Sequence, residues 1–329
     1  MKKKSQDMAG NGISAWRKRE KLAAIFFLFP ALLLIAVFAY ASFVITVIMS
    51  FYKVDWLSEP TFVGLANFSK VLHYDLFWKS LANVSVFVIE TVGFGLVAGL
   101  FFAVLMEQKI KGVGFFRVAF FMPLVISAAA TAWIFRLIFG KGYGVVPVLV
   151  TQVTGWISDL TIGGYHVGHL LLSGPIVLDP LGDPRLAMTS VAAMSIWGGL
   201  GYWILIYTAG LRSIDPGLYE SAMIDGAGFW RRTLYITVPL LRPVILFLSI
   251  TGIIRAFQLF AILLIIPPYG GTPGGPDDST QVPILLIYNI AFSQRDFGYA
   301  SALALVIFAI LLVITLIQAK VGKLSEGAP

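Results

Sequence analysis

The sequence predicts an all-α, polytopic membrane protein with six transmembrane helices, and three observations support this fold class. The chain has 329 residues, of which 58% are hydrophobic and only 12% are charged, whereas a soluble domain carries about 25% charged residues. Its mean hydropathy is +0.86. Six apolar runs are each close to or above the ~20 residues that a helix needs to cross the hydrocarbon core. They are too long for the strands of a barrel, the other fold that satisfies backbone polar groups in lipid.

The six predicted crossings are spread over most of the chain. We expect them at about 22–51, 81–106, 116–139, 186–211, 244–267 and 299–319. In the first run, Ala39-Tyr40-Ala41 is similar to the cleavage site of a signal peptide. The apolar run continues to Phe51, however, so we predict an uncleaved helix.

An even number of crossings places both termini on the same side, and the basic residues indicate which side. Of the 24 Lys and Arg residues, 16 lie in the N-terminal tail, the 107–117 and 211–243 connections and the C-terminal tail. The other connections hold 7, and Arg255 lies within a predicted helix. Cytoplasmic connections are enriched in Lys and Arg. We therefore expect the protein in the inner membrane of a bacterial cell, with both termini and the 211–243 connection in the cytoplasm. The net charge of +7 therefore indicates membrane orientation and not nucleic-acid binding.

The 211–243 connection is the longest polar segment between two strongly apolar runs. Asp215-Pro216 is a typical helix start, and Asp225-Gly226 is a turn signal. We expect a second short helix over about 229–237, ended or bent by Pro239. From the pattern alone, an amphipathic loop resting on lipid headgroups is an alternative.

This segment resembles the EAA loop of ABC importer permeases, in which Glu-Ala-Ala is followed by Gly and then by Ile-x-Leu-Pro. The matching residues are Glu220, Ala222, Gly226, Ile236 and Pro239, with Ser221 and Val238 as the two departures. The resemblance implies a coupling helix that docks on a separate cytoplasmic ATPase. It assigns the coupling contacts to Glu220, Ala222, Ile224, Asp225, Gly226 and Ala227.

Further segments, including FVGLANF, FFRVAFFMP, GGPDDST and FGYASAL, are similar to sugar-importer permeases of the maltose and glycerol-phosphate type. The resemblance covers about 20–320, apart from an apparent insertion near 157–182 and a longer PPYGGTPGGP turn. It implies the type I importer fold, a second permease subunit as heterodimer partner, an ATPase dimer that binds ATP and Mg, an extracytoplasmic solute-binding protein, a carbohydrate substrate and surrounding membrane lipid. The chain itself would bind no cofactor and would not be an enzyme.

On this reading the chain divides into a basic cytoplasmic tail (1–21), a transmembrane permease domain (22–320) that includes the coupling loop 211–243, and a cytoplasmic tail (321–329). The sequence does not indicate which carbohydrate is carried.

A sugar pathway requires aromatic faces and groups that bond hydroxyls. Such residues occur in the two crossings that flank the coupling loop, and the resemblance implies that these crossings line the translocation cavity. The candidates are Tyr202, Trp203, Arg255, Phe257, Gln258 and Phe260. Trp197 and Trp203 are also typical of interface anchors. For Gln258 we favour the cavity, because a buried amide needs a partner.

Glu90 and Arg255 are charged residues within predicted helices, where ionisable groups are costly and usually face a bundle interior. They could pair, one could line the pathway, or Arg255 could reach the interface. An ion-coupled secondary transporter with these two residues as a relay is the alternative function, although no inverted repeat is evident.

Other chemistry finds little support in the sequence. The absence of cysteine excludes disulfides and thiol catalysis. The three histidines, His73, His166 and His169, fall outside the predicted helices. His166-x-x-His169 has metal-ligand spacing but no evident third ligand. An intramembrane enzyme would need a nucleophile and a base at membrane depth, and no phosphate-binding loop is present.

Overall fold

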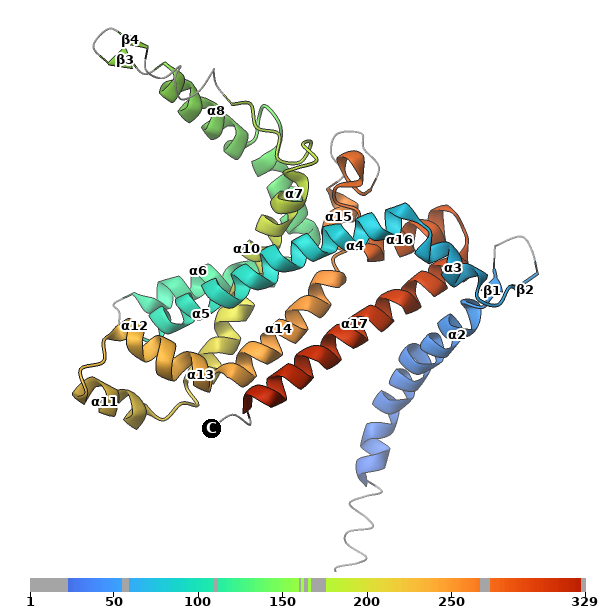
Figure 1. Cartoon of the computed structure of the whole chain (residues 1–329), viewed down its shortest axis with the longest axis horizontal. Helices are drawn as coiled ribbons and strands as arrows, with labels where there is room; N and C mark the ends of the chain where they lie inside the picture. Colours follow the sequence, from blue (N-terminus) through green and yellow to red (C-terminus); the bar gives the residue numbers. More distant parts are fainter. Residues whose placement is uncertain are drawn as a thin grey trace, which may run out of the picture.

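The protein is a bundle of long helices from which two arms project (Figure 1). One arm is the first helix, Ala23–Met49, and the other is the helix Val145–Ser158 with the short strands that follow it. The computed structural model describes residues 23–54, 59–108, 112–159, 161–162, 165–166, 176–266 and 273–326. The described strands form two short antiparallel hairpins, β1 (Tyr52–Lys53) with β2 (Thr61–Phe62) and β3 (Thr161–Ile162) with β4 (Tyr165–His166). The predicted tail 1–21 and His169 lie outside the described residues.

Five of the six predicted crossings are confirmed as helices that are long and apolar enough to span a membrane. They are Ala23–Met49, Asp75–Met106, Ala187–Leu211, Arg242–Ile265 and Phe297–Gly322. Their parts are η1 (Ala36–Ala41) and α2 (Ser42–Met49); α4 (Asp75–Val88), η2 (Ile89–Gly93) and α5 (Phe94–Met106); α10 (Ala187–Leu211); α14 (Arg242–Phe257) and α15 (Ala261–Ile265); and α17 (Phe297–Glu326). The last helix thus continues beyond the predicted end of its crossing.

The third predicted crossing differs from the expectation of one straight helix over 116–139. It is a pair, α6 (Val113–Val125) and α7 (Ala128–Phe139), bent by 106°. Ile126 is extended, with φ −75° and ψ 133°. Ser127 then begins α7, because its hydroxyl accepts a hydrogen bond from the Ala130 N–H at 3.2 Å. Pro123 lies inside α6 and does not mark the break.

The remaining described helices are short. They are α3 (Ala66–Leu72), α8 (Val145–Ser158), α11 (Pro216–Ile224), α12 (Phe229–Arg232), η3 (Thr233–Thr237), α13 (Val238–Leu240), η4 (Pro276–Asp278), α16 (Pro283–Tyr288) and η5 (Asn289–Ser293).

The central helix of the bundle is α10, which packs against α5, α6 and α14. Its close approach to α6 depends on Gly201, because a Cβ there would lie 2.4 Å from the Phe120 carbonyl oxygen. One buried cluster joins α4, α14, α16 and α17 through residues such as Phe87 and Leu286, and another joins α5, α10 and α14 through Tyr207 and Leu248. The core therefore fixes the two helices that were predicted to line the pathway.

The two ends of the bundle carry different elements. The helices α11 and α12 and the C-terminal end of α17 lie at one end, and α3, α16 and the β1–β2 hairpin lie at the other (Figure 1). The first helix, Ala23–Met49, diverges from the bundle, and none of its most apolar window is buried. The chain thus leaves an apolar helix uncovered along one side.

Candidate functional site

The predicted coupling loop forms the helix, turn and second helix that its sequence indicates. The Asp215 carboxylate accepts a hydrogen bond from the Gly217 N–H at 2.9 Å and caps α11, as predicted. At the other end, the Ala227 N–H donates to the Ala222 carbonyl (2.9 Å) and the Gly226 N–H donates to the Met223 carbonyl (3.1 Å). This is a Schellman ending, with Gly226 in the left-handed region at φ +74°.

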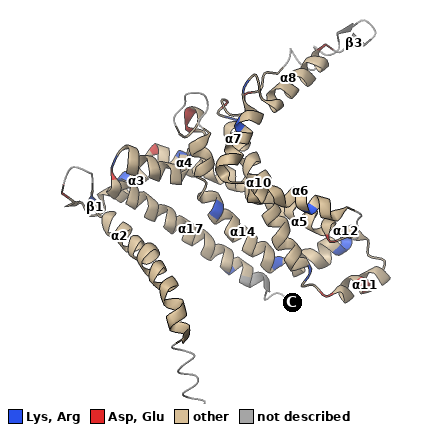
Figure 2. Ribbon diagram, turned by 180° about the vertical axis from the view of Figure 1, so that it is seen from behind, with Lys and Arg blue, Asp and Glu red and all other residues tan. Residues whose placement is uncertain are grey.

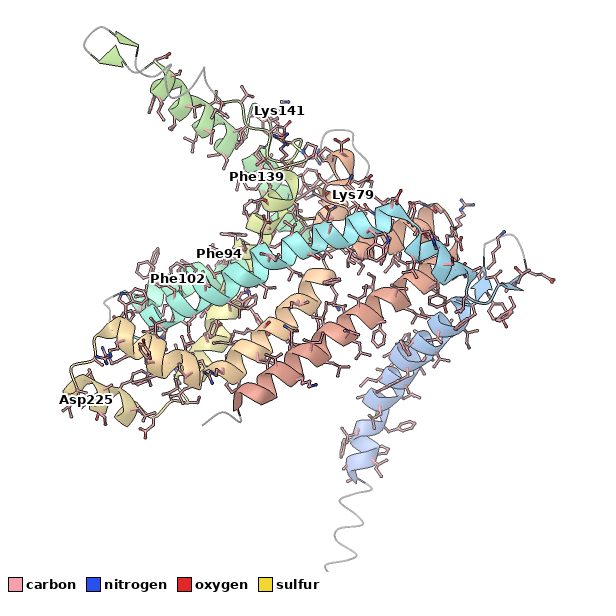
Figure 3. The ribbon with its side chains drawn as sticks, in the orientation of Figure 1. Lys79, Phe94, Phe102, Phe139, Lys141 and Asp225 are labelled. Atoms are coloured by element: carbon pink, nitrogen blue, oxygen red, sulfur yellow. The ribbon has the colours of Figure 1, made fainter. Side chains whose placement is uncertain are left out.

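The exposed position of α11 distinguishes it from the rest of the bundle. None of its residues is buried, and Ile224 is 88% exposed. Glu220, Asp225 and Gly226 are exposed as well, whereas Ala222 and Ala227 are half-buried. Figure 3 shows Asp225 at the tip of this loop, at the opposite end from Lys79 and Lys141. Leu218, Met223 and Ile224 thus expose apolar surface together on one short helix, which is typical of a docking surface.

The second helix connects α11 to the bundle. The Tyr219 and Thr237 hydroxyls are hydrogen-bonded at 2.9 Å. The helix runs without a break from α12 through η3 and α13 and ends at Leu240, one residue after Pro239 and three residues beyond the predicted end. The π-helical turn η3 ends two residues before Pro239. The buried Leu241 then separates this helix from α14.

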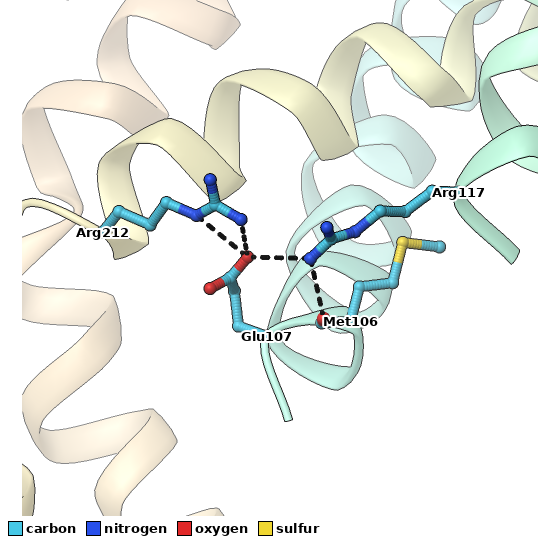
Figure 4. Close-up of polar contacts among 4 residues, drawn as sticks. All are labelled: Met106, Glu107, Arg117 and Arg212. Carbon is cyan, nitrogen blue, oxygen red and sulfur yellow. Dashed lines mark hydrogen bonds and ion pairs between the residues drawn. The ribbon is translucent and has the colours of Figure 1, made fainter. Parts of the chain in front are cut away.

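An ion-pair cluster closes the bundle next to the coupling loop. One carboxylate oxygen of Glu107, at the end of α5, lies 3.4 Å from Arg117 of α6 and 3.0 Å from Arg212 after α10 (Figure 4). Arg117 also donates to the Met106 carbonyl at 3.4 Å. Three helix ends are thereby joined, which the sequence did not predict because the partners are up to 105 residues apart.

A cavity of about 160 Å³ lies between α4–α5, α10 and α14. Three of the six pathway candidates line it: Tyr202, Trp203 and Arg255. The Arg255 guanidinium carbon lies 4.0 Å from the centroid of the Tyr202 ring, a cation–π contact. Thr91 and Ser195, which were not predicted, add hydroxyls to the wall. The only sequence signal for them is a hydroxyl residue within an apolar run.

Three glycines make room for the Trp203 side chain. A Cβ at Gly95 would lie 2.5 Å from the Trp203 ring, one at Gly252 would lie 2.8 Å from it, and one at Gly99 would lie 2.6 Å from the Trp203 Cβ. Trp203 is therefore fixed between helices at the cavity and is not placed as an interface anchor. Trp197 instead packs edge-on against Phe135 of α7, with ring centroids 5.4 Å apart.

The other three pathway candidates do not line the cavity. Phe257 is buried in the cluster between α4, α14 and α17, and Phe260 packs against the same cluster and against Tyr288. Gln258 is exposed, so the expectation of a buried amide is wrong for the chain alone. Gln258 directly follows the last residue of α14.

Glu90 and Arg255 do not pair. Glu90 lies on the π-helical η2, where one carboxylate oxygen accepts a hydrogen bond from the Thr189 hydroxyl at 2.7 Å. Its other oxygen is buried without a partner among the described residues. The relay suggested for an ion-coupled transporter is therefore not formed. Among the described residues, no three His, Cys, Asp or Glu side chains are grouped as a metal site would require.

These features define a class: a polytopic helical membrane protein with a cavity among its helices and an exposed helix at one end. The chain belongs to the family described as binding-protein-dependent transport system inner membrane components, whose model matches residues 21–324. The predicted resemblance is thereby confirmed.

Individual relatives agree along nearly the whole length. The chain is 31% identical to the probable ABC transporter permease YurN of Bacillus subtilis (94% of this chain, 98% of the relative). It is 30% identical to the lactose transport system permease LacF of Rhizobium radiobacter (94% and 97%). It is 29% identical to the trehalose/maltose transport system permease MalF of Thermococcus litoralis (96% and 99%).

The fold also matches a solved structure. A chain of a bacterial alginate ABC transporter, in complex with a periplasmic protein that holds an alginate pentasaccharide, superposes with a TM-score of 0.75. The match covers 92% of this chain and 95% of the other at 19% identity. The overall fold is therefore that of a known ABC transporter chain.

Proposed function

We propose that this chain is one of two permease subunits of an ATP-driven, binding-protein-dependent sugar importer. It moves carbohydrate inward by alternating access, and α11 receives the movement of a separate ATPase dimer. The family supports a transport subunit, and the named sugar systems of its relatives support carbohydrate as the substrate.

A continuous mechanical path from α11 to the cavity carries the proposal. The Tyr219–Thr237 hydrogen bond joins α11 to the second helix. This helix leads through Leu241 into α14, and α14 supplies Arg255 to the cavity wall. A shift of α11 by a docked ATPase would therefore move a cavity-lining helix as a rigid element.

The cavity has the chemistry that a sugar needs. Tyr202, which carries Arg255 over its ring, and the edge of Trp203 that reaches the cavity supply aromatic surface, and Arg255, Thr91 and Ser195 supply hydrogen-bonding groups. The volume of about 160 Å³ is that of the chain alone. The second permease subunit would complete the path, and it would also cover the apolar first helix.

The opposite end would receive the loaded solute-binding protein. The β1–β2 hairpin, α3 and the η4 turn lie there, outside the predicted membrane region (Figure 1). Lys79 donates to the Asp277 carbonyl, and Asn83 donates to the Asp278 and Gln281 carbonyls (2.8 and 2.9 Å). These bonds hold the η4 turn on α4, so binding at this face would act on a helix that reaches the cavity.

The test is assembly with the ATPase. Ile224→Asp places a charge at the most exposed apolar position of α11, and we expect about tenfold less ATPase to copurify with the tagged chain. Val177→Asp, 67% exposed and outside this loop, is the matched control and should leave the yield unchanged. Equal retention of the ATPase by both variants would exclude α11 as its docking helix.

A further inference from the structure

A second cavity lies behind α11 and is separate from the central cavity, although Tyr219 and Thr237 of the path described above line it. This α11 groove has a volume of about 1070 Å³ and opens between the end of α5, α11 and the α12–η3 helix. Its walls include Phe101, Glu107, Tyr219, Trp230 and Arg232. A groove of this size exceeds the central cavity several times over, and no described side chain fills it.

The charges of the α11 groove favour an anion. Arg232 lines it, and its buried Nε has no hydrogen-bond partner among the described residues. Glu107 is already engaged by Arg117 and Arg212. The other acid on the wall, Glu220, is exposed. Figure 2 shows ribbon coloured for Lys or Arg at α12 and α6, at this end of the bundle. Arg232 is half-buried, and its Nε–H is a buried donor that lacks an acceptor among the described residues, so the side chain brings a positive charge and an unused donor to the groove.

The apolar part of the groove continues onto the outer face of the bundle. Trp230 is 60% exposed and stacks on Phe101 of α5, with ring centroids 6.4 Å apart and an interplanar angle of 13°. Phe101 is itself exposed on a membrane-spanning helix. The pair therefore forms a continuous apolar surface from a membrane-spanning helix to the groove that Arg232 lines, and tryptophan is a residue that favours membrane interfaces.

We propose that the α11 groove binds one anionic phospholipid from the leaflet at this end of the bundle. The headgroup phosphate accepts from the Arg232 guanidinium, and one acyl chain lies against Phe101 and Trp230. Basic pockets beside helix ends are typical sites for such headgroups. The lipid would fill the space between α11 and α5 and so stiffen the support of the exposed helix.

The test measures lipid retained by the purified full chain. After solubilisation from membranes containing phosphatidylglycerol and phosphatidylcholine, native mass spectrometry should detect one retained phosphatidylglycerol per chain. Arg232→Gln should weaken retention about fivefold or more, and Arg232→Lys should restore part of it. Arg231→Gln removes the same charge from an exposed neighbour that does not line the groove, so it should retain the lipid.

Each other outcome would overturn the proposal. Equal loss in the Arg231 and Arg232 variants would indicate a diffuse surface effect. Retention of phosphatidylcholine equal to that of phosphatidylglycerol would exclude recognition of the charge. Displacement of the lipid by millimolar inorganic phosphate would identify a free-phosphate site instead. Gel filtration of every variant checks that the fold is intact, and Trp230→Ala, which leaves Arg232 in place, should also weaken retention.

Discussion

At the scale of single residues, backbone geometry explains why a glycine stands at the end of the coupling helix. Gly226 adopts φ +74°, where a side chain costs about 1–2 kcal/mol. A Cβ there would meet nothing within 4 Å, so the requirement is conformational and not steric. The Schellman bonds of Gly226 and Ala227 depend on this conformation.

We expect Gly226→Ala to loosen the end of α11 without unfolding the bundle. A cost of about 1 kcal/mol corresponds to an about fivefold larger equilibrium constant for opening of the affected hydrogen bonds, and so to about fivefold faster exchange. Hydrogen exchange at the Gly226 and Ala227 amides measures this. Gly228→Ala is the control, because Gly228 has φ −68° and an equally open surround. Unchanged exchange in the Gly226 variant would show that the turn tolerates a side chain.

At the scale of elements, the sequence predicted where helices form better than where they bend. The apolar runs indicated five crossings within a few residues of their observed bounds. The break between α6 and α7 was missed because apolar composition is the same on both sides of it. The Ser127 cap followed by three alanines was a local signal for a new helix start, but a serine in an apolar run is usually compatible with a continuous helix.

The Glu107 ion-pair cluster joins three helix ends, and its contribution to the free energy of unfolding depends on ionic strength. The groups are partly exposed, so each pair contributes about 0.2–1 kcal/mol. We expect Glu107→Gln to lower the free energy of unfolding by about 1 kcal/mol in low salt and by less in 1 M salt, where screening is strong. Thermal unfolding of the purified chain at the two salt concentrations measures the difference.

A matched control is available at the other end of the bundle. Asp179 makes a single ion pair with Lys141 at 3.1 Å, so Asp179→Asn should show a smaller salt-dependent loss than Glu107→Gln. An equal loss at both salt concentrations would instead assign the effect of Glu107 to packing.

At the scale of the whole molecule, the coupling loop was predictable and much of the cavity was not. The loop is contiguous, so its cap, turn and glycine appear together in the sequence. The cavity joins Thr91, Ser195 and Arg255 from three separate helices, and their inward faces depend on how α10 packs. In a helix that is apolar on all sides, periodicity does not indicate which face lines the cavity. For this reason Gln258 and Phe257 were assigned to the pathway, and Gly95 and Gly252 were missed.

The orientation of the bundle is the last prediction, and the cysteine-free chain makes its test clean. From the basic residues near α11 and the C-terminal end of α17, we expect this end to lie in the cytoplasm. Single cysteines at Ile224 and Val177, both exposed, report the two sides. A membrane-impermeant maleimide applied to spheroplasts should label the Val177→Cys chain at once. It should label Ile224→Cys only after the membrane is opened. The reverse pattern would place α11 outside the cell, where no ATPase could reach it.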